Sequence, residues 1–394
     1  MPPAMSPDVA LNQWIRHDFA AINTALEELY FAQGDRAQVE GIGGELKEEL
    51  VRRGEELLAP LLAEGRTHDG FDGALELLGD VGMYLGALRR HELTNPDRET
   101  TSPFATASAL ALHVGVSIGM APRFATAHLA THNRAVGGLR RSFTTLHDEF
   151  LFIDENTRGI FGLQSAAYAL TRLVPLGASS PVADVLFAEA ERALKGVAAC
   201  NARLFETLDI DRFFYCVRPY YKPYRVGRQV YRGANAGDFA GINEIDLMLG
   251  LCRASDPYYA QLLHEKLPYM LPAEQLRLRE CMSRRSILDQ LLDHVETDRD
   301  APWFVANVRA FLGVCDAFGA IAAQHHDQLV SRFVAGPAQT MAPGHMQGIT
   351  ASGPPLEALL RSLEILRDLR MAAPRGDIAS RHEDMARLRA AIGA

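Results

Sequence analysis

The sequence predicts an all-α protein, and three observations support this fold class. Apolar residues recur every three or four positions through most of the 394-residue chain, whereas strand-like alternation is almost absent. Several of these segments end at Gly or at polar turns, as helices do. Two long stretches without the pattern, residues 218–238 and 335–355, are rich in Gly and Pro and are predicted to be loops. Such loops in a compact helical protein are more often functional than idle.

The helices are expected in the following order. Residues 44–65 and 73–92 form two amphipathic patterns, followed by a Pro/Thr-rich connection over 93–104. Residues 158–176 are apolar nearly all round, which predicts a buried helix. The Ser-Pro pair at 180–181 begins a long helix that runs to residue 208. Helical patterning then returns over 242–252, 272–295 and 301–334, and a last helix begins near Leu356.

Composition is that of a soluble globular protein, with 48% hydrophobic and 23% charged residues. The net charge is −9, and Lys and Arg are scattered, so a nucleic-acid partner is not expected. No apolar run approaches the roughly 20 residues of a membrane span, so no membrane partner is expected either.

The N-terminal sequence "MPPAMSPDVALNQWIRHDFAA" lacks a secretory pattern, and the five cysteines form no CxxC pair. Both features favour a cytoplasmic protein with reduced, mostly buried thiols.

Two adjacent histidines, His325 and His326, interrupt the apolar helix predicted over 301–334. One apolar stripe runs along this helix, through Phe304, Val308, Phe311, Cys315, Phe318, Ala322, Leu329 and Phe333. At about 100° per residue, His326 lies roughly 40° from the axis of the stripe and His325 roughly 60° from it on the other side. Either can point inward. An inward histidine is a hydrogen-bonded core residue or an axial haem ligand, and spacing alone leaves both readings open.

A second pair, His128 and His132 in "HLATH", has the i, i+4 spacing of zinc ligands on a helix. The general-base Glu of HExxH is missing, because Leu129 follows His128. A third ligand would have to come from His147, Asp148 or Glu149. A non-haem metal site is therefore one hypothesis for this pair, and two imidazoles lining a pocket is the other.

Several short motifs, taken in order, resemble the indoleamine 2,3-dioxygenase superfamily of haem proteins. They are "YLGALRRH" at Tyr84–His91, "RPYYKPYRVGRQVYRG" from Arg218, "LPYMLPA" from Leu267, and "HDQLVSRF" from His326. Within the superfamily, the likeness is closest to the monodechloroaminopyrrolnitrin synthase branch of pyrrolnitrin biosynthesis. The resemblance extends from about Gly82 to the last helix.

The resemblance implies a two-part helical haem protein, with a small N-terminal helical domain over 1–148 that contributes to the distal pocket. A larger catalytic domain over 149–394 would hold haem b (iron protoporphyrin IX). The proximal-ligand frame HxxxVxxY/F matches His326, Val330 and Phe333, which selects His326 over His325. Asp246 matches an acid that would hydrogen-bond the far N–H of this ligand.

The resemblance also implies a distal and substrate pocket. Arg218 would hold a substrate carboxylate and Phe213 would pack on its ring. The remaining pocket residues implied are Phe124, His128, Ile160, Phe161, Gln164, Ser165, Asn235 and Ala236, with Gly233, Ala234 and Gly237 as cofactor-binding loop residues. The loop that closes over the substrate is represented by Ser352 and Gly353.

Three departures from the family pattern bear on the chemistry. Asn235 stands where the dioxygenases carry Ser, "TASGPP" replaces their "GTGG" loop, and Gln164 takes the distal Ser position. His128 is a candidate distal acid or base that the ring-opening enzymes lack, and would favour monooxygenation or rearrangement.

The expected function is therefore oxidation of an amino acid, with tryptophan or a substituted tryptophan as first choice, in biosynthesis of a secondary metabolite. O₂ or a peroxide would be the oxidant, with an electron donor as a possible partner. Two alternatives stay open: a haem-binding sensor or carrier without turnover, and a haem-dependent oxygenase of a non-indole amino acid.

Overall fold

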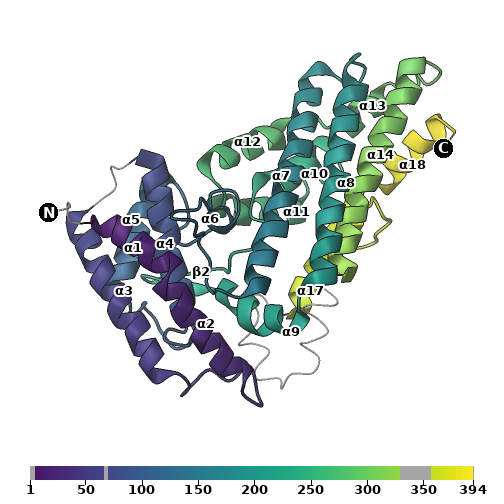
Figure 1. The fold of residues 1–394 in the computed structure, drawn as a ribbon. Helices are drawn as coiled ribbons and strands as arrows, with labels where there is room; N and C mark the ends of the chain where they lie inside the picture. Colours follow the sequence, from purple (N-terminus) through teal and green to yellow (C-terminus); the bar gives the residue numbers. More distant parts are fainter. Residues whose placement is uncertain (1–4, 66–69, 329–355, 394) are drawn as a thin grey trace. The chain divides into compact units, whose positions relative to one another are not determined.

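The computed structural model describes residues 5–65, 70–328 and 356–393, and every structural statement below concerns these residues. The all-α prediction is confirmed within them (Figure 1). The strands that they contain are β1 (Tyr224–Val226) and β2 (Gln229–Tyr231), which pair antiparallel in a small hairpin. The hairpin lies inside the stretch 218–238 that was predicted to be a loop.

The chain folds into two compact units. The first unit holds Met1–Asp154 and Leu208–Asp238, and the second holds Glu155–Thr207 and the residues from Phe239 onward that contain α10 to α18. The single boundary expected after residue 148 lies close to the first crossing. The return of the chain to the first unit over Leu208–Asp238 has no counterpart in the expected two-domain division, because a division into consecutive domains allows only one crossing.

The elements of the first unit are helices of different lengths around a central buried one. They are α1 (Pro7–Arg16), α2 (Asp18–Phe31), α3 (Gly44–Glu64), α4 (Gly70–Arg90), α5 (Ala105–Ile118), α6 (Thr126–Leu129), α9 (Ile210–Arg212), the π-helical η1 (Phe213–Val217), the 3₁₀-helical η2 (Arg218–Tyr221), β1 and β2. Helix α7 (His147–Leu176) begins in this unit and continues into the second.

Helix α4 is the centre of the first unit and is buried along most of its length. Its polar residues are paired inside the core. Arg90 makes a two-pronged ion pair with Glu27 (2.8 and 2.6 Å), and Asp80 accepts hydrogen bonds from Arg141 (2.5 Å) and Asn12 (2.8 Å). Buried charges of this kind are tolerated only when they are paired, so these contacts fix the neighbours of α4.

The second unit combines long helices, α8 and α14 among them, with several shorter ones (Figure 1). It contains most of α7, then α8 (Ala183–Thr207), α10 (Ala240–Leu249), α11 (Pro257–Lys266), the 3₁₀-helical η3 (Leu267–Tyr269), α12 (Pro272–Ser283), α13 (Ile287–Asp293), α14 (Pro302–Gln324), α17 (Leu356–Arg370) and α18 (His382–Ala391). The stretch 272–295, predicted as continuous helix, is interrupted between α12 and α13, where the Ser286 side chain accepts the Asp289 amide and caps the second helix.

Helix α14 packs against α8 and supplies the core of the second unit. The predicted apolar stripe is confirmed over its described part, since Phe304, Val308, Phe311, Cys315, Phe318 and Ala322 are all buried. Leu329 and Phe333 lie outside the described residues. The expectation that no segment is long and apolar enough for a membrane span was wrong by length and composition, because Pro302–Gln328 meets that test. However, 56% of its apolar window is buried inside the protein, which is typical of a core helix.

The five cysteines are free and buried, as the sequence predicted.

Candidate functional site

His326 lies where helix α14 changes its winding. The α-helical hydrogen bonding ends at Gln324, and residues 325–328 form a π-helical turn. Such turns inside helices are rare and frequently occur at functional sites, because the wider turn redirects the side chains that follow. The His326 side chain is 17% exposed, whereas His325 is exposed. The two adjacent histidines thus differ in exposure, and His326 is the more buried one.

Two groups lie within hydrogen-bonding distance of Nδ1 of His326, a carboxylate and a guanidinium, and they favour opposite tautomers. Nδ1 lies 2.8 Å from Oδ1 of Asp327, and a carboxylate can only accept a hydrogen bond. With Asp327 as the acceptor, Nδ1 would carry the proton and the lone pair of the ring would be on Nε2. Nη1 of Arg367, from α17, lies 3.2 Å from the same Nδ1 and 3.8 Å from Oδ1 of Asp327. In that tautomer Nδ1 cannot accept from Arg367, and the guanidinium would interact with the carboxylate alone.

This arrangement fits an axial haem ligand. Metal-binding imidazoles commonly donate their other N–H to a carboxylate, which fixes the tautomer and raises the basicity of the ligating nitrogen. Asp246, which was expected to accept the hydrogen bond from His326, has other hydrogen-bond partners. Asp246 accepts from Arg370 (2.9 and 2.8 Å) and from the hydroxyl of Tyr259 (2.7 Å), at a completely buried position. Asp246 thus holds the end of α17, and Asp327 takes the place next to His326.

The predicted distal residues on α7 divide between two faces of the helix. Ile160 is buried, and Gln164 donates to Oε1 of Glu274 (3.2 Å). Phe161 is 51% exposed, and Ser165, one turn later, is exposed and donates to the Phe161 carbonyl (2.9 Å). The sequence placed all four above the iron, but only Phe161 and Ser165 share an open face. Tyr168, 61% exposed, continues this face and was not identified from the sequence.

Glu274 explains why Gln164 turns inward. Burial raises the pKa of Glu274, and the amide of Gln164 is among the groups that lower it. The backbone of α7 also passes close to α10, because a Cβ added at Gly241 would lie 3.3 Å from the Gln164 nitrogen.

Arg218 and Phe213 are both buried in the first unit, where the chain is wound tightly. Phe213 begins η1 and Arg218 begins η2. The ring of Phe213 lies 5.0 Å from that of Phe152, and the guanidinium of Arg218 lies 5.7 Å from the centre of the Phe214 ring. Burial lowers the pKa of Arg218 to about 10. A guanidinium that is desolvated to this extent favours an anionic group.

Phe124 and His128 are packed against a row of glycines on α4. A Cβ added at Gly82 would lie 2.1 Å from the Phe124 nitrogen, and one at Gly79 would lie 2.8 Å from the imidazole of His128. Phe124 is fully buried, with its ring 5.2 Å from that of Phe143. These close approaches explain why the helix carries glycine at positions that face the 123–128 segment.

His128 is enclosed by its own segment. The Ala125 amide donates to its Nδ1 (2.8 Å), and the side chain is 1% exposed. Burial, with the nearby charge of Arg141, lowers the pKa of His128 to about 3, so the ring is neutral. These contacts give His128 a structural use, and its role as a distal acid or base stays a prediction.

The premise of the zinc hypothesis for His128 and His132 was wrong. Helix α6 ends at Leu129, so the two residues do not share a helical face. His132 contacts the hydroxyl of Thr131 (2.9 Å), and Glu149 accepts the backbone amides of Phe143 and Thr144 (both 2.6 Å). Among the described residues, no group of three or more His, Cys, Asp or Glu side chains is arranged to hold a metal ion.

The glycine-rich loop is built as a turn around Asn235 and Asp238. Oδ1 of Asn235 accepts the Gly237 amide (2.8 Å), and Asp238 accepts the Asn235 amide (3.0 Å) and pairs with Arg232 through both oxygens (2.9 and 2.8 Å). Thr126 donates to the Asn235 carbonyl (2.6 Å), which ties the loop to the Phe124–His128 segment. Asn235 thus replaces the family serine with a side chain that closes the turn itself.

Part of this loop is closely packed. Gly233 and Ala234 are buried, whereas Ala236 and Gly237 are partly exposed. Ser352, Gly353, Val330 and Phe333 lie outside the described residues.

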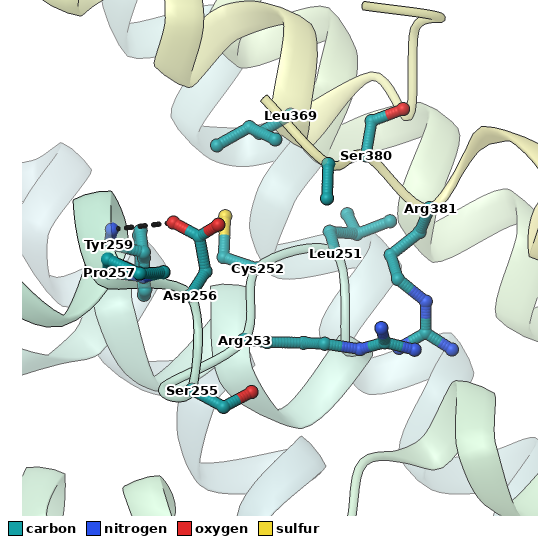
Figure 2. A pocket seen from close by; sticks show the side chains of 11 residues that line it. Leu251, Cys252, Arg253, Ser255, Asp256, Pro257, Tyr259, Leu369, Ser380 and Arg381 are labelled. Carbon is teal, nitrogen blue, oxygen red and sulfur yellow. Dashed lines mark hydrogen bonds between the residues drawn. The ribbon is translucent and has the colours of Figure 1, made fainter. Parts of the chain in front are cut away.

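A separate cavity of about 240 Å³ lies in the second unit, between the end of α10, the start of α11 and the segment before α18 (Figure 2). Its charged groups are paired, since Arg381 binds Asp289 (2.6 Å) and Asp384 (2.5 Å), and Asp256 accepts the Tyr259 amide (2.9 Å). None of the predicted site residues lines it.

The structure groups the predicted site residues by unit. The second unit holds His326, Asp246, Ile160, Phe161, Gln164 and Ser165, and the first holds Phe124, His128, Phe213, Arg218 and the loop Gly233–Gly237. Sequence reasoning did not identify Asp327 and Arg367, which contact His326. Asp327 could have been identified from its position in the sequence, since it directly follows the selected histidine. Arg367 is brought to His326 only by the tertiary fold.

The family comparison covers nearly the whole chain: residues 6–392 match the model of the family described as monodechloroaminopyrrolnitrin synthase PrnB.

Proposed function

Because the chain belongs to the monodechloroaminopyrrolnitrin synthase PrnB family, we propose that it oxidises tryptophan or a ring-substituted tryptophan at a haem b bound by His326. The family is one of haem-dependent oxidoreductases within the indoleamine 2,3-dioxygenase-like superfamily, so the chain is an enzyme of this kind. The observation that carries the proposal is the contact of His326 Nδ1 with Asp327, the kind of carboxylate partner that metal-binding imidazoles commonly have.

When bound, the haem supplies the activation of O₂ or of a peroxide, which the side chains of the protein cannot do themselves. In this proposal, the protein binds and orients the substrate and excludes water around it. Phe161 and Ser165 are the α7 side chains open for contact with the distal side of such a group, Phe161 by its apolar ring and Ser165 by its hydroxyl.

Arg218 is proposed to pair with the carboxylate of the substrate, and Phe213 to pack on its ring. The planar guanidinium suits a two-pronged contact with a carboxylate, and its burial makes that contact stronger than it would be in water. The ordered turn at Asn235 offers a fixed backbone for close approach of the substrate or macrocycle.

The proposal also includes O₂ or a peroxide as the oxidant, an electron donor as a partner, and a cytoplasmic location. Five free, buried cysteines are compatible with a reducing compartment. His128 is proposed as a proton-transfer residue. Its replacement by alanine is expected to lower turnover while the haem spectrum stays close to that of the wild type.

The experiment that tests this function uses the haem-loaded protein and paired ligands. Tryptophan, chlorotryptophan and tryptamine are titrated while the Soret absorption is recorded. Arg218→Gln is expected to weaken binding of tryptophan by about tenfold or more, because a charge-assisted hydrogen bond contributes about 1.5–3 kcal/mol. Binding of tryptamine, which lacks the carboxylate, should change little.

Arg212→Gln is the matched control, because Arg212 lies in the same segment and pairs with Glu28 (2.8 Å). Equal losses for tryptophan and tryptamine in Arg218→Gln, or no spectral response of the wild type to any amino acid, would contradict the proposed substrate class. Oxygen uptake and product analysis with the tightest-binding amino acid then separate dioxygenation from other oxidations.

A further inference from the structure

The His326 imidazole has a carboxylate partner that the sequence comparison does not indicate. Asp327 follows His326 directly, and its Oδ1 lies 2.8 Å from Nδ1. Adjacent residues in an α-helix point about 100° apart, and their side chains do not face each other. The π-helical turn over residues 325–328 changes this geometry exactly where the contact is made.

Asp246, the acid that was expected to hydrogen-bond His326, has other hydrogen-bond partners. Asp246 has no exposed surface, and its oxygens accept from Nε and Nη2 of Arg370 and from Tyr259. Two of these bonds run to one guanidinium, in the parallel geometry typical of a stable structural pair. Asp246 therefore anchors the C-terminal end of α17.

Helix α17 connects the two acids. Arg370 binds Asp246, and Arg367, one turn earlier on the same helix, faces Asp327 and His326. Arg367 is itself held by Asp368 (2.9 and 2.8 Å). Asp368 is in turn paired with Arg375. The position of Arg367 is thus fixed by a row of ion pairs, and its charge lies 3.8 Å from the Asp327 carboxylate.

We propose that Asp327 is the positioning residue that orients His326 and sets its electron donation to the iron, and that Arg367 limits this donation. The inference rests on the proposed function, because it takes His326 as the haem ligand. A negative charge on the N–H side of the imidazole gives the ring more imidazolate character, which strengthens the Fe–Nε2 bond and stabilises ferric over ferrous iron. Arg367 opposes this effect by neutralising part of the Asp327 charge.

The test uses haem-loaded protein, with the Fe–Nε2 stretching vibration of the ferrous form and the ferric/ferrous midpoint potential as readouts. Asp327→Asn is expected to lower the stretching frequency and to shift the potential to more positive values. Loss of haem to apomyoglobin should accelerate by roughly tenfold or more, since partners of metal ligands contribute 10- to 100-fold in affinity. Arg367→Gln is expected to move the frequency in the opposite direction.

Two controls separate this role from a general effect of charge or of folding. Asp316→Asn removes an exposed acid from the same helix, one that pairs with Arg389 (3.0 Å), and should leave the frequency unchanged. Asp246→Asn tests the competing acid and should lower stability without shifting the frequency.

An unchanged frequency and potential in Asp327→Asn would overturn the inference, as would a shift in Asp246→Asn alone. Whether His326 is the ligand at all is decided separately. If His326→Ala keeps the Fe–histidine vibration, the proposed function fails; if that vibration is lost while Asp327→Asn is unchanged, only this inference fails.

Discussion

His128 and His326 were both predicted from the sequence to be functional histidines. They differ in their hydrogen-bond partners and in their exposure. The Nδ1 of His128 accepts a hydrogen bond from the backbone of its own segment, in a core where the ring is 1% exposed. The Nδ1 of His326 lies 2.8 Å from a carboxylate oxygen, and its side chain keeps accessible surface. In the first arrangement the ring holds the backbone, and in the second it has the carboxylate partner that is common for metal-binding imidazoles. The comparison shows that the group next to Nδ1, a backbone amide at His128 and a carboxylate at His326, distinguishes a structural histidine from a candidate metal ligand.

The largest expected effect concerns the core around His128. Gly82→Ala would place a methyl group 2.1 Å from the Phe124 nitrogen, which is backbone and cannot rotate away. We expect a loss of more than about 4 kcal/mol in the free energy of unfolding, enough to prevent normal folding. Gly196→Ala in α8 meets nothing within 4 Å and should be neutral or stabilising. Urea denaturation of both variants measures the difference, and a stable Gly82→Ala protein would mean that the segment packs differently.

Two neighbouring residues on α7, in the unit that also holds His326, offer a second comparison. Ile160 is 4% exposed, so Ile160→Ala should cost about 3 kcal/mol of stability through the cavity it leaves. Phe161→Ala should change stability by less than about 1 kcal/mol, because half of its surface is already exposed. In haem-loaded protein, Phe161→Ala should nevertheless alter the spectral response to amino acids. If Phe161→Ala destabilises as much as Ile160→Ala, this face of α7 is core and not open.

Acidification should distinguish His128 from an ordinary surface histidine. Burial lowers the pKa of His128 to about 3, below the value of 6.5 in the unfolded chain, so the folded state binds fewer protons between these values. The free energy of unfolding should therefore fall with falling pH, by about 1.4 kcal/mol per pH unit, and His128→Gln should lack this part of the dependence. Denaturation of both proteins at pH 6, 5 and 4 measures the difference. Parallel pH profiles would show that His128 is accessible to protons in the folded state.

The smallest effect is expected at the loop that departs from the family pattern. Asn235→Ser removes the hydrogen bond from the Gly237 amide to Oδ1 and should cost about 0.5–1 kcal/mol, since serine closes such turns less well. Ala236→Ser, in the same loop, adds a hydroxyl without removing that bond and serves as the control. Thermal unfolding of the two variants is the measurement, and equal melting temperatures would show that the Asn235 side chain does not hold the turn.

The fold class and the apolar stripe of α14 were predictable because they depend on local periodicity, which one sequence records fully. The hairpin of β1 and β2 was not, because its strands have three residues each and lie among Gly, Pro and Tyr. Spacing identified two candidate histidines, His325 and His326, and the family frame selected His326, which is the less exposed of the two. Asp327 as the partner was missed because the expected geometry was an α-helix, whereas residues 325–328 form a π-helical turn. The inward direction of Gln164 depends on Glu274, which lies 110 residues later in the chain and meets it only after folding.

The central claim is that Nε2 of His326 binds the iron, and the visible spectrum of haem-reconstituted variants tests it most directly. His326→Ala is expected to lose the wild-type Soret band and the Fe–histidine vibration of the ferrous form, while His325→Ala and His128→Gln keep both. A wild-type spectrum in His326→Ala, or its loss in His325→Ala alone, would contradict the account.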